Sequence, residues 1–246
     1  MTATVYHTAL SPSTATASTA ATGYAATNAL TTAVGKPWRS TTTAGSTTLI
    51  IDLGSSKAVA AVAVNHINAS SVTVHADNSA TPTTLKGTLT SYADGQGRRK
   101  GLLAFSATVR YIMLTFSGTP TDAAAYWTAG SVYVFSTAAA LPRDPLFGSD
   151  QSIDWPQIAQ RLPNGSTLRI DRGTSRMAVR LRFSARITDD VESLARYARA
   201  GAVWLDLGLP SAQWCQWPLT HADDGITRQW SGHNREPITL PLLELA

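Results

Sequence analysis

The sequence predicts a mainly β protein with two unlike units, a β-sandwich over residues 1–140 and a second β-sandwich or split barrel with one α-helix over residues 141–246. Three observations support this fold class. From Thr47 onwards, apolar and polar residues alternate with a period of two, as half-buried antiparallel strands require. Charged residues make up 15% of the chain, well below the usual share of about 25%, and Thr, Ser and Ala take their place. A segment rich in Ala and Pro at 138–145 then separates two stretches of different pattern.

The N-terminal residues 1–35 are biased towards Ala and Thr and contain little to bury, most clearly in the run from Thr14 to Thr22. Such a segment can be a flexible arm, or an extended segment that becomes ordered against a partner. The sequence leaves both alternatives open.

The first clear strand follows a polar turn at Trp38-Arg39-Ser40. After a short Thr/Gly/Ser linker, residues 49–54 read as a buried strand that ends in Asp-Leu-Gly. Further alternating strands are predicted at 58–66, 71–76, 111–116 and 131–135. The breaks between them contain the Asn, Asp, Gly, Pro and Ser residues that turns require. Strands of this number and spacing predict a sandwich.

A Trp-x-Ser turn followed by an Ile-Asp-Leu-Gly strand resembles the opening of the discoidin-type, or galactose-binding-like, β-sandwich family, over about residues 24–137. The resemblance implies a jelly-roll sandwich that begins near Tyr24 and binds sugars or lipids with aromatic rings on the loops at one end. It therefore gives three candidate ligand-binding residues: Trp38, Tyr126 and Trp127. The alternative is that the two tryptophans fill the core of the sandwich. Asp52 is expected to form hydrogen bonds at a strand end rather than to contact a ligand.

The formal charge of +4 arises in the first unit, where residues 1–140 contain eight Lys or Arg against four Asp or Glu. The tight basic cluster in this unit is Arg98-Arg99-Lys100, with glycines on both sides. It fits either a solvated hairpin tip or a contact with phosphate or an acidic glycan, with Arg98 and Arg99 as the contacting residues. A nucleic-acid binder would show a longer basic stripe with interleaved aromatic residues, so specific nucleic-acid binding is not expected.

The second unit is predicted to contain a hairpin, one helix and further strands. Residues 167–171 and 176–187 alternate cleanly and read as the two strands of the hairpin. The period then changes, and Asp189 can cap a helix over about residues 189–200 that ends at Gly201. Strands are expected again at 202–207 and 237–246.

Three arginines, Arg176, Arg180 and Arg182, fall on one face of the predicted strand at 176–187. Since residues two apart on a strand are separated by roughly 7 Å, these cations need acidic partners, either from the paired strand, with Asp171 as the candidate, or from a neighbouring subunit. Five of the seven tryptophans also fall beyond residue 140, and enrichment in aromatic residues and arginine is typical of subunit interfaces. The residues predicted to form such an interface are Arg176, Arg180, Arg182, Trp204, Trp214 and Trp217. An ordinary core with Arg–Asp pairs on its rim explains the same bias.

The sequence contains no arrangement typical of catalysis or metal binding. The five histidines have no metal-ligand spacing to one another or to the single cysteine. One hypothesis is a hydrolase with Cys215 as nucleophile and His221 as base. The simpler interpretation is that the Cys215 thiol is buried and structural. One cysteine also excludes an intrachain disulfide. We therefore expect no enzyme activity, no metal ion and no cofactor.

The order of hairpin, helix and strands beyond residue 141 is similar to that of phage tail-tube and distal-tail proteins, whose sheets join between subunits into rings. This resemblance implies a virion structural protein at the tail tip or baseplate of a long-tailed phage. It would assemble in the host cytoplasm as a homo-oligomeric ring, a hexamer or a trimer, with other tail proteins, and its sandwich would contact host-surface glycans. The alternative is a carbohydrate-binding module without catalytic activity. No signal peptide and no membrane-spanning apolar run is apparent, so no membrane insertion is expected.

Overall fold

The computed structural model is mainly β, which confirms the predicted fold class. It describes residues 4–31, 35–93, 99–141, 150–154, 157–161, 167–171, 176–183, 193–194, 196–197, 200–206, 216–221, 227–228 and 238–244. No helix in these ranges is long and apolar enough to cross a membrane.

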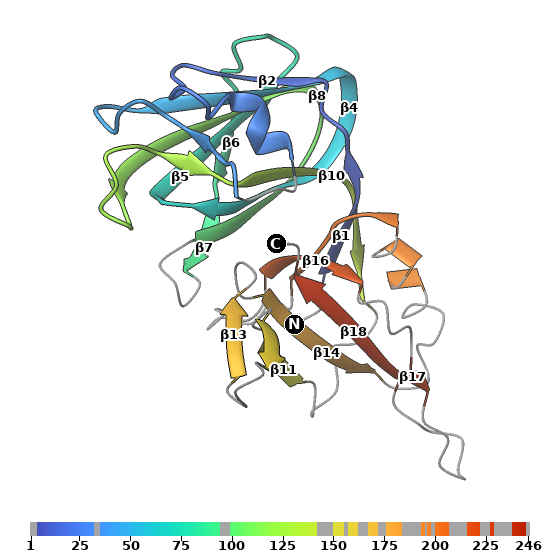
Figure 1. Cartoon of the computed structure of the whole chain (residues 1–246). Helices are drawn as coiled ribbons and strands as arrows, with labels where there is room; N and C mark the ends of the chain where they lie inside the picture. Colours follow the sequence, from blue (N-terminus) through green and yellow to red (C-terminus); the bar gives the residue numbers. More distant parts are fainter. Residues whose placement is uncertain are drawn as a thin grey trace.

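Two long antiparallel strands, β4 (Thr47–Ile67) and β8 (Arg99–Pro120), carry the sandwich. The strands predicted at 49–54 and 58–66 are thus one continuous strand. Register shifts interrupt the β4–β8 ladder between Asp52 and Lys57 and again between Val59 and Ala61. Because such irregularities bend a strand, β4 and β8 can take part in both layers of the sandwich (Figure 1).

Each layer contains one part of β4 and one part of β8. The first half of β4 pairs with β2 (Thr14–Ala17), and its second half pairs with β10 (Ser131–Ala140). The first layer has the strand order β2, β4, β8, β5 (Ala69–Asp77) and β6 (Leu85–Thr88). The second layer has the order β1 (Thr4–Leu10), β10, β4, β8 and β7 (Thr90–Ala93).

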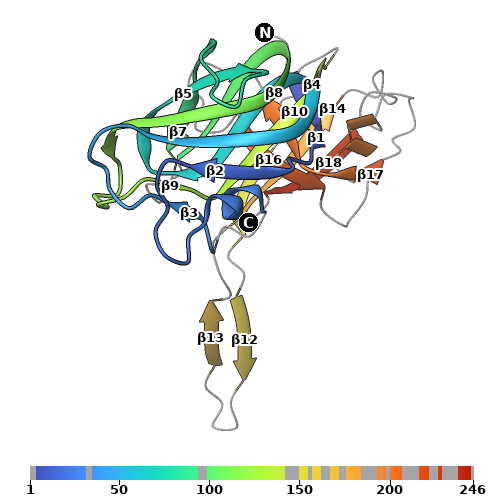
Figure 2. The ribbon, with the colours of Figure 1, turned by 90° about the horizontal axis from the view of Figure 1, so that it is seen from above.

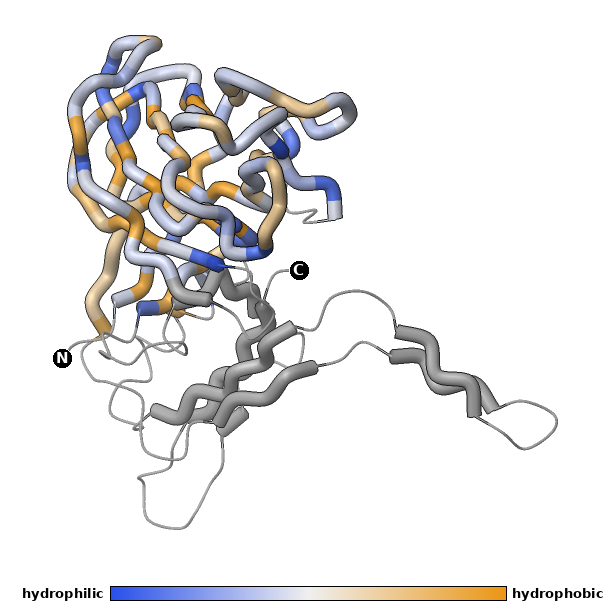
Figure 3. The backbone as a smooth tube through the Cα atoms, turned by 90° about the vertical axis from the view of Figure 1, so that its left-hand side faces the viewer, coloured by the Kyte–Doolittle hydropathy of each residue, from blue (hydrophilic) through white to orange (hydrophobic). Residues whose placement is uncertain are grey.

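The core of the sandwich lies between these two layers. Alternate residues of both halves of β4 enter the same apolar cluster, so Leu49 and Ile51 from one layer join Val62 and Val64 from the other. Figure 3 shows the same alternation as hydrophobic and hydrophilic segments along the strands. Each fully buried aliphatic side chain of this kind contributes about 1.5–3 kcal/mol to folding. The period-two pattern of the sequence is therefore the direct cause of the sandwich.

Strand β1 joins the sandwich to the C-terminal part of the chain. It pairs with β10 on one side and with β15 (Val203–Asp206) on the other. The sheet continues through β16 (Gln216–His221), β18 (Ile238–Glu244), β14 (Arg176–Phe183) and β11 (Asp150–Asp154), and β17 (Thr227–Arg228) also pairs with β18. Residues 4–10 and 14–17 of the Ala/Thr-rich arm are therefore ordered as strands within the chain. The division at residue 141 stays a prediction, since one hydrogen-bonded sheet runs across it.

The hairpin predicted from residues 167–171 and 176–187 is wrong. β13 (Thr167–Asp171) instead pairs with β12 (Gln157–Arg161) in a separate two-stranded sheet (Figure 2). β14 lies between β11 and β18, where the register sets Val179 opposite Leu242 and Leu181 opposite Leu240. The distant strands β11 and β18 are thus the partners of β14, in place of the sequence-adjacent β13.

The predicted helix is visible in the described residues of its second half. Ser193, Leu194, Arg196, Tyr197 and Ala200 are helical, and the remainder of the predicted range lies outside the described residues. Leu194 is buried, as expected for the apolar stripe of this helix. The N–H of Gly201 donates a hydrogen bond to the carbonyl of Tyr197 at 3.2 Å, which ends the helix where the sequence predicts. The strands expected around 202–207 and 237–246 are β15 and β18.

Candidate ligand-binding site

The turn at Trp38-Arg39-Ser40 lies beside the segment that contains Trp127. β3 (Trp38–Arg39) pairs with β9 (Thr128–Ala129), with Arg39 opposite Thr128. Ser40 is buried and stabilises this pairing with two hydrogen bonds. Its Oγ accepts a hydrogen bond from the N–H of Trp127 at 2.8 Å, and its N–H donates one to the carbonyl of Trp127 at 2.9 Å. Two segments that are almost ninety residues apart are thus brought together at one end of the sandwich.

Both tryptophans of this region fill the core. Trp38 and Trp127 have 0% exposed surface, and the Trp38 ring packs against Phe116 with the ring centroids 5.0 Å apart. The indole N–H of Trp38 donates a hydrogen bond to the carbonyl of Thr19 at 3.2 Å. Rings without exposed surface cannot stack on a sugar, so the candidacy of Trp38 and Trp127 as ligand contacts is corrected to a packing role.

Tyr126, the third candidate, belongs to a cluster at the surface with Arg39 and Tyr24. The Arg39 guanidinium carbon lies 4.1 Å from the ring centroid of Tyr24 and 4.9 Å from that of Tyr126. All three side chains are half-buried. A guanidinium over an aromatic ring is held by a cation–π interaction, and here two rings hold the same group. We call these three residues the tyrosine–arginine cluster.

Asn68, between β4 and β5, fixes the loop that presents Tyr126. Its side chain is 2% exposed, and its Nδ2 donates to the carbonyl of Tyr126 at 2.8 Å and to Oδ1 of Asp122 at 3.0 Å. Its Oδ1 accepts a hydrogen bond from the N–H of Thr128 at 2.8 Å. A buried amide needs its partners, so the loop is bound to Asn68 at three points and Tyr126 is held beside Arg39.

The polar groups of the tyrosine–arginine cluster have few partners among the residues that the structure describes. Within the described ranges, Arg39 has no carboxylate partner, and its buried Nε has no hydrogen-bond acceptor. The terminal nitrogens of Arg39 and the hydroxyls of Tyr24 and Tyr126 make no hydrogen bond with a described residue and are not buried. These donors can therefore be offered to a bound molecule.

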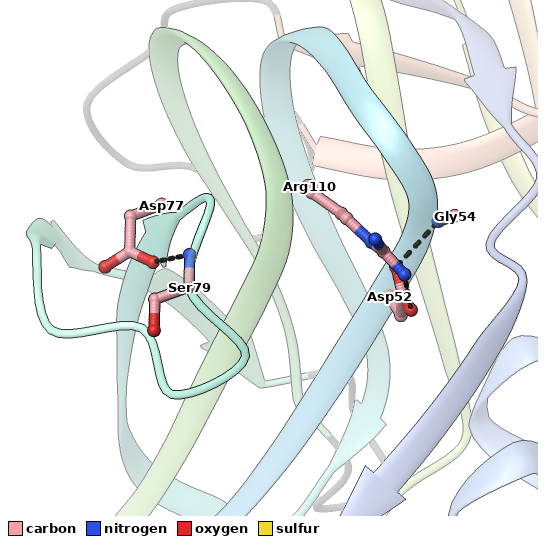
Figure 4. A network of polar contacts seen from close by, with 5 residues as sticks. All are labelled: Asp52, Gly54, Asp77, Ser79 and Arg110. Carbon is pink, nitrogen blue, oxygen red and sulfur yellow. Dashed lines mark hydrogen bonds and ion pairs between the residues drawn. The ribbon is translucent and has the colours of Figure 1, made fainter.

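A second arginine, Arg110, shows the contrasting case (Figure 4). Its Nε and Nη2 donate to the two carboxylate oxygens of Asp52 at 2.9 Å and 3.0 Å. Oδ1 of Asp52 also accepts a hydrogen bond from the N–H of Gly54 at 2.7 Å. The hydrogen bond from Arg110, and that from Gly54, lower the pKa of Asp52. This confirms Asp52 as a hydrogen-bonding residue of the strand end, and the Ile-Asp-Leu-Gly motif as part of the fold.

Figure 4 also shows Asp77, which holds the turn after β5. Its Oδ1 accepts from the N–H of Ser79 at 2.6 Å, and its Oδ2 accepts from the N–H of Thr83 at 2.8 Å. The hydrogen bonds from Thr83 and Ser79 lower the pKa of Asp77. Among the residues described, no group of three or more His, Cys, Asp or Glu side chains is placed to hold a metal ion.

The predicted basic cluster lies at the same end of the sandwich, but its part in binding stays a prediction. Arg99 is opposite Ile67, the residue before Asn68. Its Nε donates to Oγ of Ser91 at 3.0 Å and its Nη2 to the carbonyl of Ser91 at 3.2 Å, so this side chain braces β7. Arg98 lies outside the described residues.

Of the residues predicted to form a subunit interface, Trp204 is the one whose side-chain burial the structure describes. Trp204 has 0% exposed surface and packs against Tyr133 and Phe135 of β10 inside the same chain, so its assignment to a subunit interface is corrected to the core.

The register sets Asp154 opposite Arg176 and Asp150 opposite Arg180, while Asp171 is in a different sheet. Arg182 is opposite Thr239 and Trp217 is opposite Leu205. Trp214 and Cys215 lie outside the described residues.

The sequence did not identify Tyr24 or Asn68 as site residues. Tyr24 is the single aromatic residue in the Ala/Thr-rich stretch 11–30. This was the one feature of the sequence that could have indicated a role for Tyr24 in the site. Asn68 is the single residue between β4 and β5, where an Asn suits any turn. Its role depends on contacts with residues 121–128, which no local pattern reveals.

Comparison with solved structures gives matches to carbohydrate-binding modules and lectin domains, each covering about half of the chain. Chitosan-binding module 1 of a chitosanase/glucanase from Paenibacillus sp. IK-5 matches with 27% identity and a TM-score of 0.43, over 52% of this chain and 99% of that chain. The CBM32 of AlyQ, in complex with 4,5-unsaturated mannuronic acid, matches with 22% identity and a TM-score of 0.45, over 53% and 100%. The family 32 module of C. perfringens NanJ, in complex with galactose, matches with 17% identity and a TM-score of 0.44, over 53% and 98%. No protein-family model matches the chain. No curated protein sequence matches it.

Proposed function

We propose that the protein is a non-catalytic carbohydrate-binding module, and that Tyr24, Arg39 and Tyr126 contact the sugar. The observation that carries this proposal is the contact of the Arg39 guanidinium with two tyrosine rings, while its terminal donors and both phenol hydroxyls are unpaired in the described part of the chain. Sugar sites combine aromatic surface with a few well-placed polar groups, because a sugar has both C–H faces and hydroxyls. Asn68 and Ser40 hold this arrangement in advance of binding, which lowers the entropic cost of association.

A glycan array followed by isothermal titration calorimetry tests the proposal. The full-length protein should bind a defined group of glycans, and Tyr126→Ala and Arg39→Ala should each weaken binding by about tenfold or more. Arg196→Ala is the matched control, because Arg196 is exposed on the helix and belongs to a different region. Binding that is equally strong in Tyr126→Ala, Arg39→Ala and Arg196→Ala would place the sugar elsewhere. Absence of any glycan binding would refute the proposed function.

The virion role is the second proposal, in which copies of the chain form a ring at a phage tail tip and contact glycans and other tail proteins. Its support is the two unlike β units and the excess of Arg and Trp beyond residue 140. The comparisons above lend it no support. Light scattering after size-exclusion chromatography should give a trimeric or hexameric mass, and Arg180→Glu should lower that mass without unfolding the protein. A monomer at all concentrations argues against this role and leaves the carbohydrate-binding proposal untouched.

A further inference from the structure

The two described arginines that contact aromatic rings in the sandwich differ in how their charge is balanced. Arg110 forms two hydrogen bonds with the carboxylate of Asp52, although its guanidinium also lies over a ring, that of Tyr111. The Arg39 guanidinium contacts two rings and has no carboxylate within ion-pair distance among the described residues. The cluster thus contains a cation whose counter-charge the described chain does not supply.

The acidic residue of the adjoining loop, Asp122, does not fill this role. Asp122 already accepts hydrogen bonds at Oδ1 from Asn68 Nδ2 at 3.0 Å and from the N–H of Ala124 at 3.2 Å, and it forms no ion pair with Arg39. Arg99 stands at the same end of the sandwich, opposite Ile67. Residues 1–140 also contain four more cationic than acidic side chains, eight against four. The positive charge of residues 1–140 as a whole, together with the Arg39 guanidinium that lacks a described carboxylate partner, therefore favours an anion.

The fixed orientation of Arg39 favours a planar anion in particular. The rings of Tyr24 and Tyr126 both contact the guanidinium, and the β3–β9 pairing fixes its backbone. A guanidinium presents parallel N–H donors that match the two oxygens of a carboxylate, and such bidentate pairs are stronger than neutral hydrogen bonds. Because the side chain is already immobilised, little rotamer entropy is lost when it pairs. The adjacent phenol hydroxyls can then bind the hydroxyls of the same sugar.

We propose that the ligand of this module is an acidic glycan, and that Arg39 pairs with the carboxylate of a hexuronic acid residue. This inference rests on the proposed function, since it assigns a charge to the sugar that the tyrosine–arginine cluster contacts. The donors of the cluster predict a ligand with a carboxylate and pyranose hydroxyls. Which of the tested oligomers binds will show the linkage of the polymer.

The experiment compares each acidic polymer with its own carboxyl-reduced form. Polygalacturonate, polymannuronate and polyguluronate oligomers and their carboxyl-reduced counterparts are titrated into the full-length protein by calorimetry, beside an array of neutral and sulfated glycans. At least one uronate should bind about tenfold or more tightly than its reduced form, as expected for one charge-assisted bidentate pair. Added NaCl should weaken the uronate complex and leave the reduced one nearly unchanged.

Variants of Arg39 assign the effect to that side chain. Arg39→Gln should remove the preference for the uronate, while Arg39→Lys, which keeps the charge and loses the planar fork, should retain a smaller preference. Arg196→Gln, at an exposed helical position, should leave the preference intact. Thermal unfolding of each variant checks the fold, and Arg39→Lys serves if Arg39→Gln does not fold.

Each outcome distinguishes the two proposals. Equal binding of acidic and reduced glycans, or a preference for sulfated over carboxylated ones, overturns the carboxylate inference and leaves the carbohydrate-binding function standing. A uronate preference that survives in Arg39→Gln also overturns it, because the carboxylate then binds elsewhere. Failure to bind any glycan, neutral or acidic, overturns the proposed function itself and the inference with it.

Discussion

The charged residues Asp52 and Arg39 differ in whether a described residue of opposite charge pairs with them. Asp52 receives hydrogen bonds from Arg110 and Gly54, and these keep its carboxylate ionised at the end of a strand segment. Arg39 receives two aromatic rings and no carboxylate from the described residues. The first arrangement stabilises the native state, and the second leaves a guanidinium without a carboxylate partner among the described residues.

The lowered pKa of Asp52 predicts an acid-dependent loss of stability. Because the folded-state pKa lies below the ordinary carboxyl value of about 3.9, the stabilisation is complete above that value and is lost as the pH falls through the folded-state pKa. Urea unfolding of the wild type and of Asp52→Asn should therefore show a gap at neutral pH that narrows in acid. Asp77 titrates in the same direction but is present in both proteins, so its effect cancels. A gap that is independent of pH would contradict the assignment.

At the scale of elements, the loop between β8 and β9 (Thr128–Ala129) is held by the side-chain amide of Asn68. Asn68 binds Asp122, Tyr126 and Thr128, and its own carbonyl accepts a hydrogen bond from the N–H of Thr121 at 2.8 Å. Without its side chain, the carbonyl of Tyr126 and the N–H of Thr128 lose their partners. The loop that carries Tyr126 would then no longer be fixed beside Arg39.

Asn68→Ala is accordingly expected to lower both stability and glycan affinity. Two backbone groups that lose their hydrogen bonds cost about 1–3 kcal/mol each, so the free energy of unfolding should fall by at least about 2 kcal/mol. Calorimetric titration at a temperature where the variant is folded measures the affinity. Asn78→Ala, at an exposed position of the turn after β5, is the matched control and should change neither quantity. Unchanged affinity in a folded Asn68→Ala protein would separate the loop from the site.

Local patterns in the sequence predicted those elements whose partners follow from alternation or from strong turn chemistry. The strands around Ile51, Val74 and Leu114 followed from period-two spacing, since one buried face imposes that spacing. The pairing of β14 could not be predicted, because three candidate partners are compatible with its alternation and only the packed sheet selects two of them. The role of Tyr24 was also hidden, because its contact with Arg39 joins segments that no repeat or motif connects.

At the scale of the whole molecule, the outer face of the second layer is also a packing surface. Tyr133 and Phe135 of β10 point away from the sandwich core and join Tyr6 and Trp204 in a second apolar cluster. The ring of His7 stacks on that of Tyr197, with centroids 3.7 Å apart, and burial lowers the pKa of His7. The C-terminal residues that are described around Trp204 thus cover a face of the sandwich that would otherwise be apolar and exposed.

Trp204→Ala should therefore destabilise the protein strongly. Truncation of a buried tryptophan costs about 3–5 kcal/mol, and the free energy of unfolding in urea should fall by that amount. Leu85→Ala is the control, because Leu85 is 61% exposed and its truncation should cost less than about 0.5 kcal/mol. Since Trp204 lies outside the core of the sandwich, the folded variant should keep its glycan affinity. A cost as small as that of Leu85→Ala would show that the cluster around Trp204 is not packed in solution.

The position of β1 has a consequence for the order in which the protein folds. β1 is synthesised before both of its neighbours in the sheet, β10 and β15, which come from residues 131–140 and 203–206. The backbone groups of β1 therefore lack one or both partners until residue 206 has been synthesised. Pairings across such long sequence separations form slowly, because the chain loses entropy when the long loop closes, before the strand contacts that offset this loss have formed. Until then Val5 and Tyr6 remain uncovered on the nascent chain, where a chaperone or the strand edge of another molecule can compete for them.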